Sequence, residues 1–158
     1  MANTIPVNYE LQFEPLFHNF TFKGVEIITI SLSKATDLII LDAAELKIKK
    51  CHVEQGTKII TANASLNEKN ERLTIKLSKK IKGKAKLCIR FTGVLNDRLL
   101  GFYKSQYKDN KRKTKYLATT QFEAADARRA FPCWDEPAVK ATFDVSLLVD
   151  RHHDAISN

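Results

Sequence analysis

Apolar and polar residues alternate along most of this 158-residue chain, and that period of two most constrains its fold. Successive side chains of a β-strand point to opposite faces, so alternation indicates strands with one buried and one solvated face. The pattern covers residues 7–13, 28–32, 73–77, 87–91 and 143–149. No segment keeps a helical period over three turns. We therefore expect an all-β domain, built as a saddle-like, sandwich-type curved sheet of many short antiparallel or mixed strands.

Turn-forming pairs such as Lys23-Gly24 and Lys82-Gly83 separate the alternating segments. One short helical turn is expected at 126–130, with Asp126 as its N-cap. The chain has no evident linker or repeat, and its hydrophobic fraction of 44% suits a packed core. Residues 1–158 are therefore interpreted as a single β domain.

The net charge of +8 suggests an anionic partner, but its distribution weakens that interpretation. The excess is mostly lysine, with six lysines at 76–86 and five at 104–115. Lysines spaced along strands are typical of a solvated face or a protected sheet edge, whereas recognition of phosphates by geometry favours arginine. A basic β-sandwich module that binds nucleic acid or another anionic partner stays open as an alternative, without the interleaved aromatic residues that would support it.

Signals for membranes or secretion are lacking in the sequence. The longest apolar runs are short, such as 38–41, and the N-terminus lacks both a basic region and an apolar region. The three cysteines are widely spaced and form no C-x-x-C pair, which fits a reducing compartment. We expect a cytoplasmic protein with no membrane partner.

Residues 119–137 differ from the rest, since they hold the single tryptophan and two of the four prolines. Residues 116–123 are expected to form a strand, on which Gln121 and Glu123 would share one face. A carboxylate beside an amide could bind a small cation such as an α-ammonium group. The alternative is that both side chains simply face solvent at the end of a strand, and the residue pattern by itself leaves both interpretations open.

Two arginines follow in the same stretch. Arg128 and Arg129 could form ion pairs with Asp135 and Glu136 and so tie the turn to the sheet. Proline fixes φ and lowers the entropy that a loop loses on ordering, so the two prolines would stiffen it. A rigid loop held by salt bridges is the expected role of these charged residues, in preference to catalysis.

The run QFEAADARRAFPCWDEP at 121–137 closely resembles the signature of the aminopeptidase N / puromycin-sensitive family of zinc aminopeptidases. Further segments resemble the family's strands and loops and occur in its order, so the resemblance spans nearly the whole chain. They are PVNYEL at 6–11, FKGVE at 22–26, LIILDA at 38–43, FTGVLND at 91–97, LGFYKS at 100–105, KATF at 140–143 and DAISN at 154–158.

This resemblance implies the N-terminal, saddle-shaped β domain of these enzymes, which packs over a thermolysin-like catalytic domain. The position matched by Glu123 binds the free α-amino group of the substrate, and the position matched by Gln121 lines the pocket for the first side chain. The implied partners are peptides with a free N-terminus and the enzyme's own catalytic domain. A face that docks on that domain would be exposed in this chain and could drive self-association.

The zinc motif H-E-x-x-H does not occur in the sequence, and neither does the family's G-x-M-E-N loop. The four histidines, His18, His52, His152 and His153, are interpreted as surface or tail residues. No catalytic residue and no metal ligand is therefore assigned, and zinc is expected in a catalytic domain outside this chain. We expect these 158 residues alone to bind no zinc and hydrolyse nothing, as an excised domain or the first part of a longer enzyme.

Overall fold

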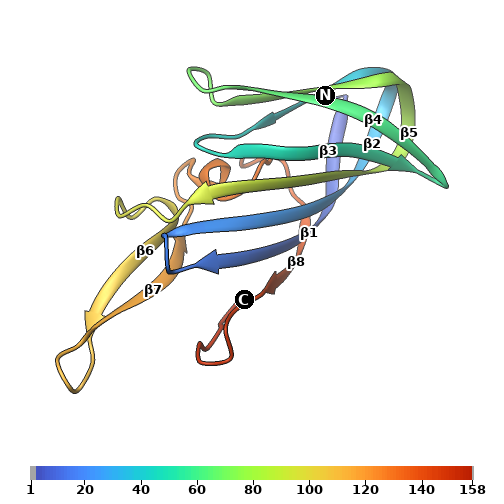
Figure 1. The fold of residues 1–158 in the computed structure, drawn as a ribbon. Coiled ribbons are helices and arrows are strands. Elements are labelled where there is room, and N and C mark those ends of the chain that lie inside the picture. Colours follow the sequence, from blue (N-terminus) through green and yellow to red (C-terminus); the bar gives the residue numbers. More distant parts are fainter. Residues whose placement is uncertain (1–2, 158) are drawn as a thin grey trace.

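The computed structural model describes residues 3–157 and is all-β, with one short helical turn (Figure 1). The strands are β1 (Thr4–Leu16), β2 (Thr21–Asp42), β3 (Lys47–Gln55), β4 (Lys58–Asn67), β5 (Arg72–Val94), β6 (Gly101–Lys108), β7 (Thr114–Gln121) and β8 (Thr142–Leu147). The helical turn is the 3₁₀ element η1 (Ala127–Arg129). The expected fold class is confirmed.

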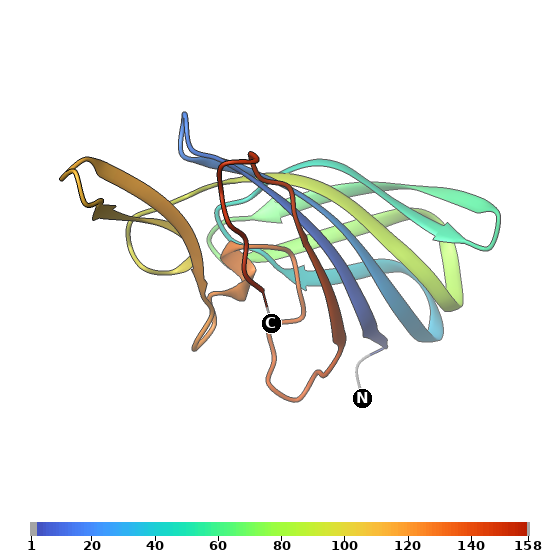
Figure 2. The same cartoon turned by 90° about the horizontal axis from the view of Figure 1, so that it is seen from below.

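Six strands form one mixed sheet in the order β3-β4-β5-β2-β1-β8, with a further pairing of β3 and β5. The pairs within this main sheet are antiparallel, except that β8 runs parallel to β1. Strands β6 and β7 form a separate two-stranded hairpin. Figures 1 and 2 show this hairpin projecting beyond one end of the main sheet, with β8 lying beside β1.

Two strands are much longer than the sequence suggested, with 22 residues in β2 and 23 in β5. Their pairing shifts register on both sides of Thr36, where the sheet bends. The first part of β5 pairs with β4 and the end of β2, and its second part pairs with β3 and the start of β2. The sheet therefore curves back on itself and encloses a core (Figure 1). The expectation of many short strands was wrong here, because polar residues at the bend continue the strands instead of ending them.

The core contains the apolar residues that the alternation marked on β2 and β5. Ile28, Ile30, Leu87 and Ile89 are at most 1% exposed. Phenylalanine rings at one end of the core meet edge to face with centroids 5.1–6.4 Å apart, namely those of Phe13, Phe22, Phe91, Phe102 and Phe131.

Glycine is required where these rings approach the backbone. A Cβ added at Gly24 would overlap the ring of Phe91, and one at Gly93 would overlap the ring of Phe22. The two glycines therefore let large rings pack directly against the backbone of β2 and β5.

Strand β1 departs from the expected pattern at its start. The register with β2 shifts between Pro6 and Asn8, which is a β-bulge. A shift of one residue exchanges the two faces of a strand, so Val7 is 47% exposed whereas Tyr9 and Leu11 are buried. The expectation that Val7 shares the buried face was wrong for this reason.

The edge strand β8 also differs from its expected burial. Phe143 and Val145 were expected on a buried face, but they are 52% and 39% exposed. The ring of Phe143 stacks on that of Tyr9 at 4.8 Å and meets that of Phe131 edge to face at 6.2 Å, and it also lines an open groove. No helix among residues 3–157 is long and apolar enough to cross a membrane.

Candidate functional site

The signature segment, residues 121–137, begins where β7 ends and returns to the main sheet through η1. Strand β7 stops at Gln121, so the expected strand is two residues too long and Glu123 lies in the turn that follows. The peptide bond between Glu123 and Ala124 is cis. Because Glu123 lies outside β7, the rule that residues i and i+2 of a strand share a face does not apply to this pair.

Gln121 and Glu123 are both exposed, and both line an open groove of about 730 Å³. The apolar wall of this groove consists of Leu11 and Phe13 from β1 and of Phe143, Val145 and Leu147 from β8. Residues of β7 and the signature segment line the opposite side. The groove therefore runs between the main sheet and the β6–β7 hairpin, with a carboxylate and an amide among its polar groups.

Arg128 holds the signature segment to the end of β2. Its Nε donates to Oδ2 of Asp135 at 2.9 Å, and its Nη1 lies 3.2 Å from Oε2 of Glu71 and 3.6 Å from Oδ1 of Asp42. The Arg128 side chain is only 17% exposed, so these charges are partly desolvated and depend on one another. The expected pair of Arg128 with Asp135 is confirmed.

Arg129 makes a second set of ion pairs. Its Nε lies 2.9 Å from Asp126, its Nη1 2.7 Å from Glu45, and its Nη2 2.8 Å from Glu71. Asp126 occupies the N-cap position of η1, as expected, but its carboxylate accepts from Arg129 and makes no capping hydrogen bond. A Cβ at Gly101 would lie 2.7 Å from the Cβ of Arg129, so glycine there lets β6 begin against the turn.

The backbone of the segment is joined to the strand that the sequence shows as LIILDA. Asp42 and Cys133 exchange two hydrogen bonds, of 2.7 and 2.9 Å, between their backbone N–H and C=O groups. The N–H of Asp135 donates to Oδ2 of Asp42, and the N–H of Trp134 donates to the hydroxyl of Tyr9. The Asp42 side chain, 3% exposed, is therefore a central anchor that the residue pattern did not single out.

Glu71 and Glu45 were also missed, although each binds an arginine of the segment. Both have positive φ, of 52° and 58°, and both follow or precede strands at turns. Acidic residues at the turns beside LIILDA were the available signal, but nothing in the sequence shows which turn meets which arginine. Glu136, expected as a partner of the arginines, is exposed and forms no ion pair with either of them.

The acidic residues of the signature segment therefore fall into two groups. Asp126 and Asp135 are partly buried and neutralised by arginine. Glu123 is exposed in the groove, and no Lys, Arg or His among residues 3–157 forms an ion pair with it. Its carboxylate is available to a cation that enters from outside.

A buried polar group lies beneath the segment, on the core face of β2. Glu26 is 0% exposed, and neither of its oxygens has a hydrogen-bond partner in the described part of the chain. Desolvation raises the pKa of this carboxyl well above its usual range, because burial disfavours its charged form. Desolvation also raises the pKa of Tyr9 and of the Cys133 thiol, and that of Cys51 to about 12.

An all-β domain with this anchored segment is the architecture that the sequence resemblance described, and comparison with known proteins bears this out. Residues 5–158 match the family described as the Peptidase M1 N-terminal domain, and the chain belongs to that family. It is 40% identical over 159 residues to aminopeptidase 2 of Candida albicans and 41% identical over 156 residues to the puromycin-sensitive aminopeptidase of Caenorhabditis elegans.

Aminopeptidase M1 of Arabidopsis thaliana is 40% identical over 160 residues. These alignments cover 97–99% of this chain but only 16–18% of each relative. The chain therefore corresponds to about a sixth of the length of these relatives, and the other five-sixths have no counterpart in it.

Proposed function

We propose that the chain is the substrate-anchoring N-terminal domain of a zinc metalloaminopeptidase, which removes N-terminal amino acids from peptides. In this proposal Glu123 binds the α-ammonium group of the substrate. Gln121, beside it, lines the pocket for the first side chain. The domain supplies recognition, and a catalytic domain beyond these 158 residues supplies the chemistry.

The carboxylate of Glu123, which forms no ion pair within the described residues, is the observation that carries this proposal. It is exposed in the groove, whereas the neighbouring Asp126 and Asp135 are neutralised by arginines. A carboxylate that faces a partly desolvated ammonium makes a charge-assisted hydrogen bond, and such bonds contribute about 1.5–3 kcal/mol. An internal peptide bond offers no cation at this point, so the contact selects a free N-terminus.

This sequence lacks the motif that would bind the catalytic zinc of such an enzyme. The sequence has no H-E-x-x-H, and Glu123 has neither a histidine nor a cysteine grouped with it for metal binding. A zinc ion in the catalytic domain would activate water and polarise the scissile carbonyl. The role left to this chain is to hold the substrate's N-terminus at a fixed distance from that centre, and alone it should hydrolyse nothing.

The test is steady-state kinetics of the protein joined to its catalytic domain, with a fluorogenic amino acid amide as substrate. Glu123→Gln keeps the size of the side chain and removes its charge. We expect kcat/KM to fall by about 10- to 150-fold, the equivalent of one charge-assisted hydrogen bond. N-acetylation of the substrate should abolish turnover by the unmodified enzyme, because it removes the cation.

Glu136→Gln is the matched control, since Glu136 is also an exposed acid of the signature segment but does not line the groove. This variant should retain the activity of the unmodified enzyme. Equal activity of the Glu123→Gln enzyme, or an equal loss in both variants, would refute the assignment of Glu123.

The alternative function, binding of nucleic acid through the basic segments, has no comparable observation in its favour. Two of those lysines are paired with acids, Lys76 with Asp37 at 2.6 Å and Lys86 with Glu10 at 3.3 Å. A cytoplasmic location stays a prediction, based on the three free cysteines.

A further inference from the structure

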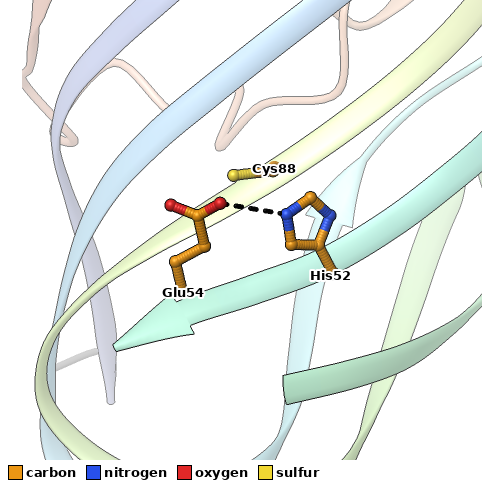
Figure 3. Close-up of side chains that lie close together, drawn as sticks. All are labelled: His52, Glu54 and Cys88. Carbon is orange, nitrogen blue, oxygen red and sulfur yellow. Dashed lines mark hydrogen bonds and ion pairs between the residues drawn. The ribbon is translucent and has the colours of Figure 1, made fainter. Parts of the chain in front are cut away.

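The outer face of the main sheet, opposite the core, carries a mixed cluster of metal-binding side chains. His52 on β3 is the direct register partner of Cys88 on β5, and Glu54 lies two residues beyond His52 on the same face. Figure 3 shows the thiol of Cys88 near the gap between the Glu54 carboxylate and the His52 ring. The intervening Val53 is buried, so this face points away from the groove that contains Glu123.

The distances suit a transition metal. One ring nitrogen of His52, one oxygen of Glu54 and Sγ of Cys88 all lie within 4.8 Å of one another. Tetrahedral Zn²⁺ has metal–ligand bonds of about 2.0–2.3 Å, so its ligand atoms are roughly 3.3–3.7 Å apart. Small side-chain rotations would bring the three atoms to these separations without moving the strands.

The surroundings leave these ligands available. His52 Nε2 lies 3.2 Å from Oε1 of Glu54, while the buried Nδ1 has no hydrogen-bond partner among residues 3–157. Lys86 is the register partner of Glu54, but its ammonium lies 3.3 Å from Glu10 instead. The Glu54 carboxylate therefore keeps coordinating capacity, and two adjacent paired strands hold the three side chains in place.

We propose that His52, Glu54 and Cys88 form a binding site for a divalent transition metal ion of the Zn²⁺ class. Imidazole, thiolate and carboxylate together suit Zn²⁺ or Co²⁺, whereas Mg²⁺ and Ca²⁺ take oxygen ligands. Water fills the fourth position on the solvent side, and the thiol proton leaves to solvent when the sulfur binds. The ion joins β3 to β5 and is separate from any zinc that a catalytic domain holds.

Cobalt reports on this site specifically, because a thiolate bound to Co²⁺ gives a charge-transfer absorption band in the near ultraviolet. The family zinc motif has His and Glu ligands and no cysteine, so a catalytic centre would not give this band. The experiment titrates CoCl₂ into the metal-stripped protein, with whatever further domains it has, under a non-thiol reductant. We expect the band to saturate at one ion per chain, to disappear on addition of ZnCl₂, and to be accompanied by a higher melting temperature with Zn²⁺.

Substitutions distinguish a metal site of three side chains from cobalt binding to a single cysteine thiol. Cys88→Ser should abolish the band, and His52→Gln should weaken Co²⁺ binding by at least about 100-fold, beyond the 10–100-fold typical of losing an outer-shell group. Cys51→Ser is the matched control, because Cys51 is next to His52 but packs against the core from the other face. It should keep the band.

The proposal is overturned if no band forms, if the band survives Cys88→Ser, or if Cys51→Ser removes it. Binding by His52→Gln that equals that of the unmodified protein also overturns it, since cobalt would then bind a lone cysteine adventitiously. Urea unfolding of each variant shows that it is folded, so loss of the band in a folded Cys88→Ser or His52→Gln protein supports the site.

Discussion

Replacement of the buried carboxyl of Glu26 should change how stability depends on pH. The ordinary pKa of a glutamate is about 4.5, whereas desolvation raises that of folded Glu26 well above this value. Above pH 4.5 the unfolded chain releases this proton and the folded chain retains it. The favourable contribution of the neutral folded carboxyl is therefore complete below pH 4.5 and is lost as pH rises toward the folded pKa.

The size of this pH dependence follows from a difference of one bound proton between the folded and unfolded states. The free energy of unfolding falls by about 1.4 kcal/mol per pH unit while the folded state holds one proton more than the unfolded state. This fall begins above pH 4.5 and ends where the pH reaches the folded pKa. Glu26→Gln cannot ionise, and its buried amide costs the same at every pH. The difference in unfolding free energy, variant minus unmodified chain, should therefore rise with pH above 4.5, by about 1.4 kcal/mol per pH unit until the folded pKa is reached.

Urea unfolding at pH 5.5, 6.5 and 7.5, followed by the fluorescence of Trp134, measures this difference. Other titrating groups are common to both chains and cancel. Asp37→Asn is the control: a hydrogen bond from Lys76 lowers the pKa of Asp37, so its contribution is present above pH 3.8 and is lost only as pH falls. Its difference should be constant from pH 5.5 to 7.5.

A constant difference for Glu26→Gln would refute the reasoning, because it would mean that Glu26 ionises alike in the folded and unfolded chains. Glu26→Val should show the same rise with pH, offset by a constant that reflects its different packing. A rise in only one of the two variants would likewise contradict a single-proton origin.

Three further outcomes are expected. Gly24→Ala should lower the free energy of unfolding by about 1–3 kcal/mol, because its Cβ would overlap the ring of Phe91; an unchanged urea midpoint would contradict this. Arg129→Ala removes three ion pairs and should cost about 1–3 kcal/mol, measured in the same way. Burial raises the pKa of Cys51 to about 12 and of Cys88 to about 11, from 9.0. At pH 8 the thiolate fraction should therefore be lower than in the unfolded chain by about 1000-fold for Cys51 and about 100-fold for Cys88, and both should react more slowly with a disulfide reagent.

The sequence predicted the fold class because most of its alternation is uninterrupted. Ile28, Ile30 and their neighbours on β5 keep a strict period of two, and all are buried. The errors fall where a non-local contact sets the outcome. The bulge beside Val7 depends on pairing with β2, and the exposure of Phe143 depends on what lies across the groove. Neither the register of a distant strand nor the absence of a covering element has a local signature.

The candidate site was predictable only where its residues are contiguous in the sequence. Gln121 and Glu123 came from a contiguous motif, and the structure brings both to one groove. The anchors Asp42 and Glu71 are distant in sequence from the arginines they bind, and only chain folding identifies them. Neither His52 nor Cys88 was assigned as a metal ligand, because strand pairing and not sequence spacing places them together.

The acids of this chain show why residue identity alone did not determine function. Glu26 is enclosed by the sheet, which raises its pKa, and Asp135 faces Arg128 and is neutralised. Glu123 lies past the end of β7, and no cation among residues 3–157 forms an ion pair with it. In the signature segment, the arginines neutralise the acids that hold it to the main sheet, and Glu123 lies outside these ion pairs. The proposed contact with the substrate amine requires two conditions. The segment must be held in place, because on a flexible loop the conformational entropy lost on binding would offset the attraction of the carboxylate. The carboxylate must also have no arginine partner, because one beside Arg128 would already be paired.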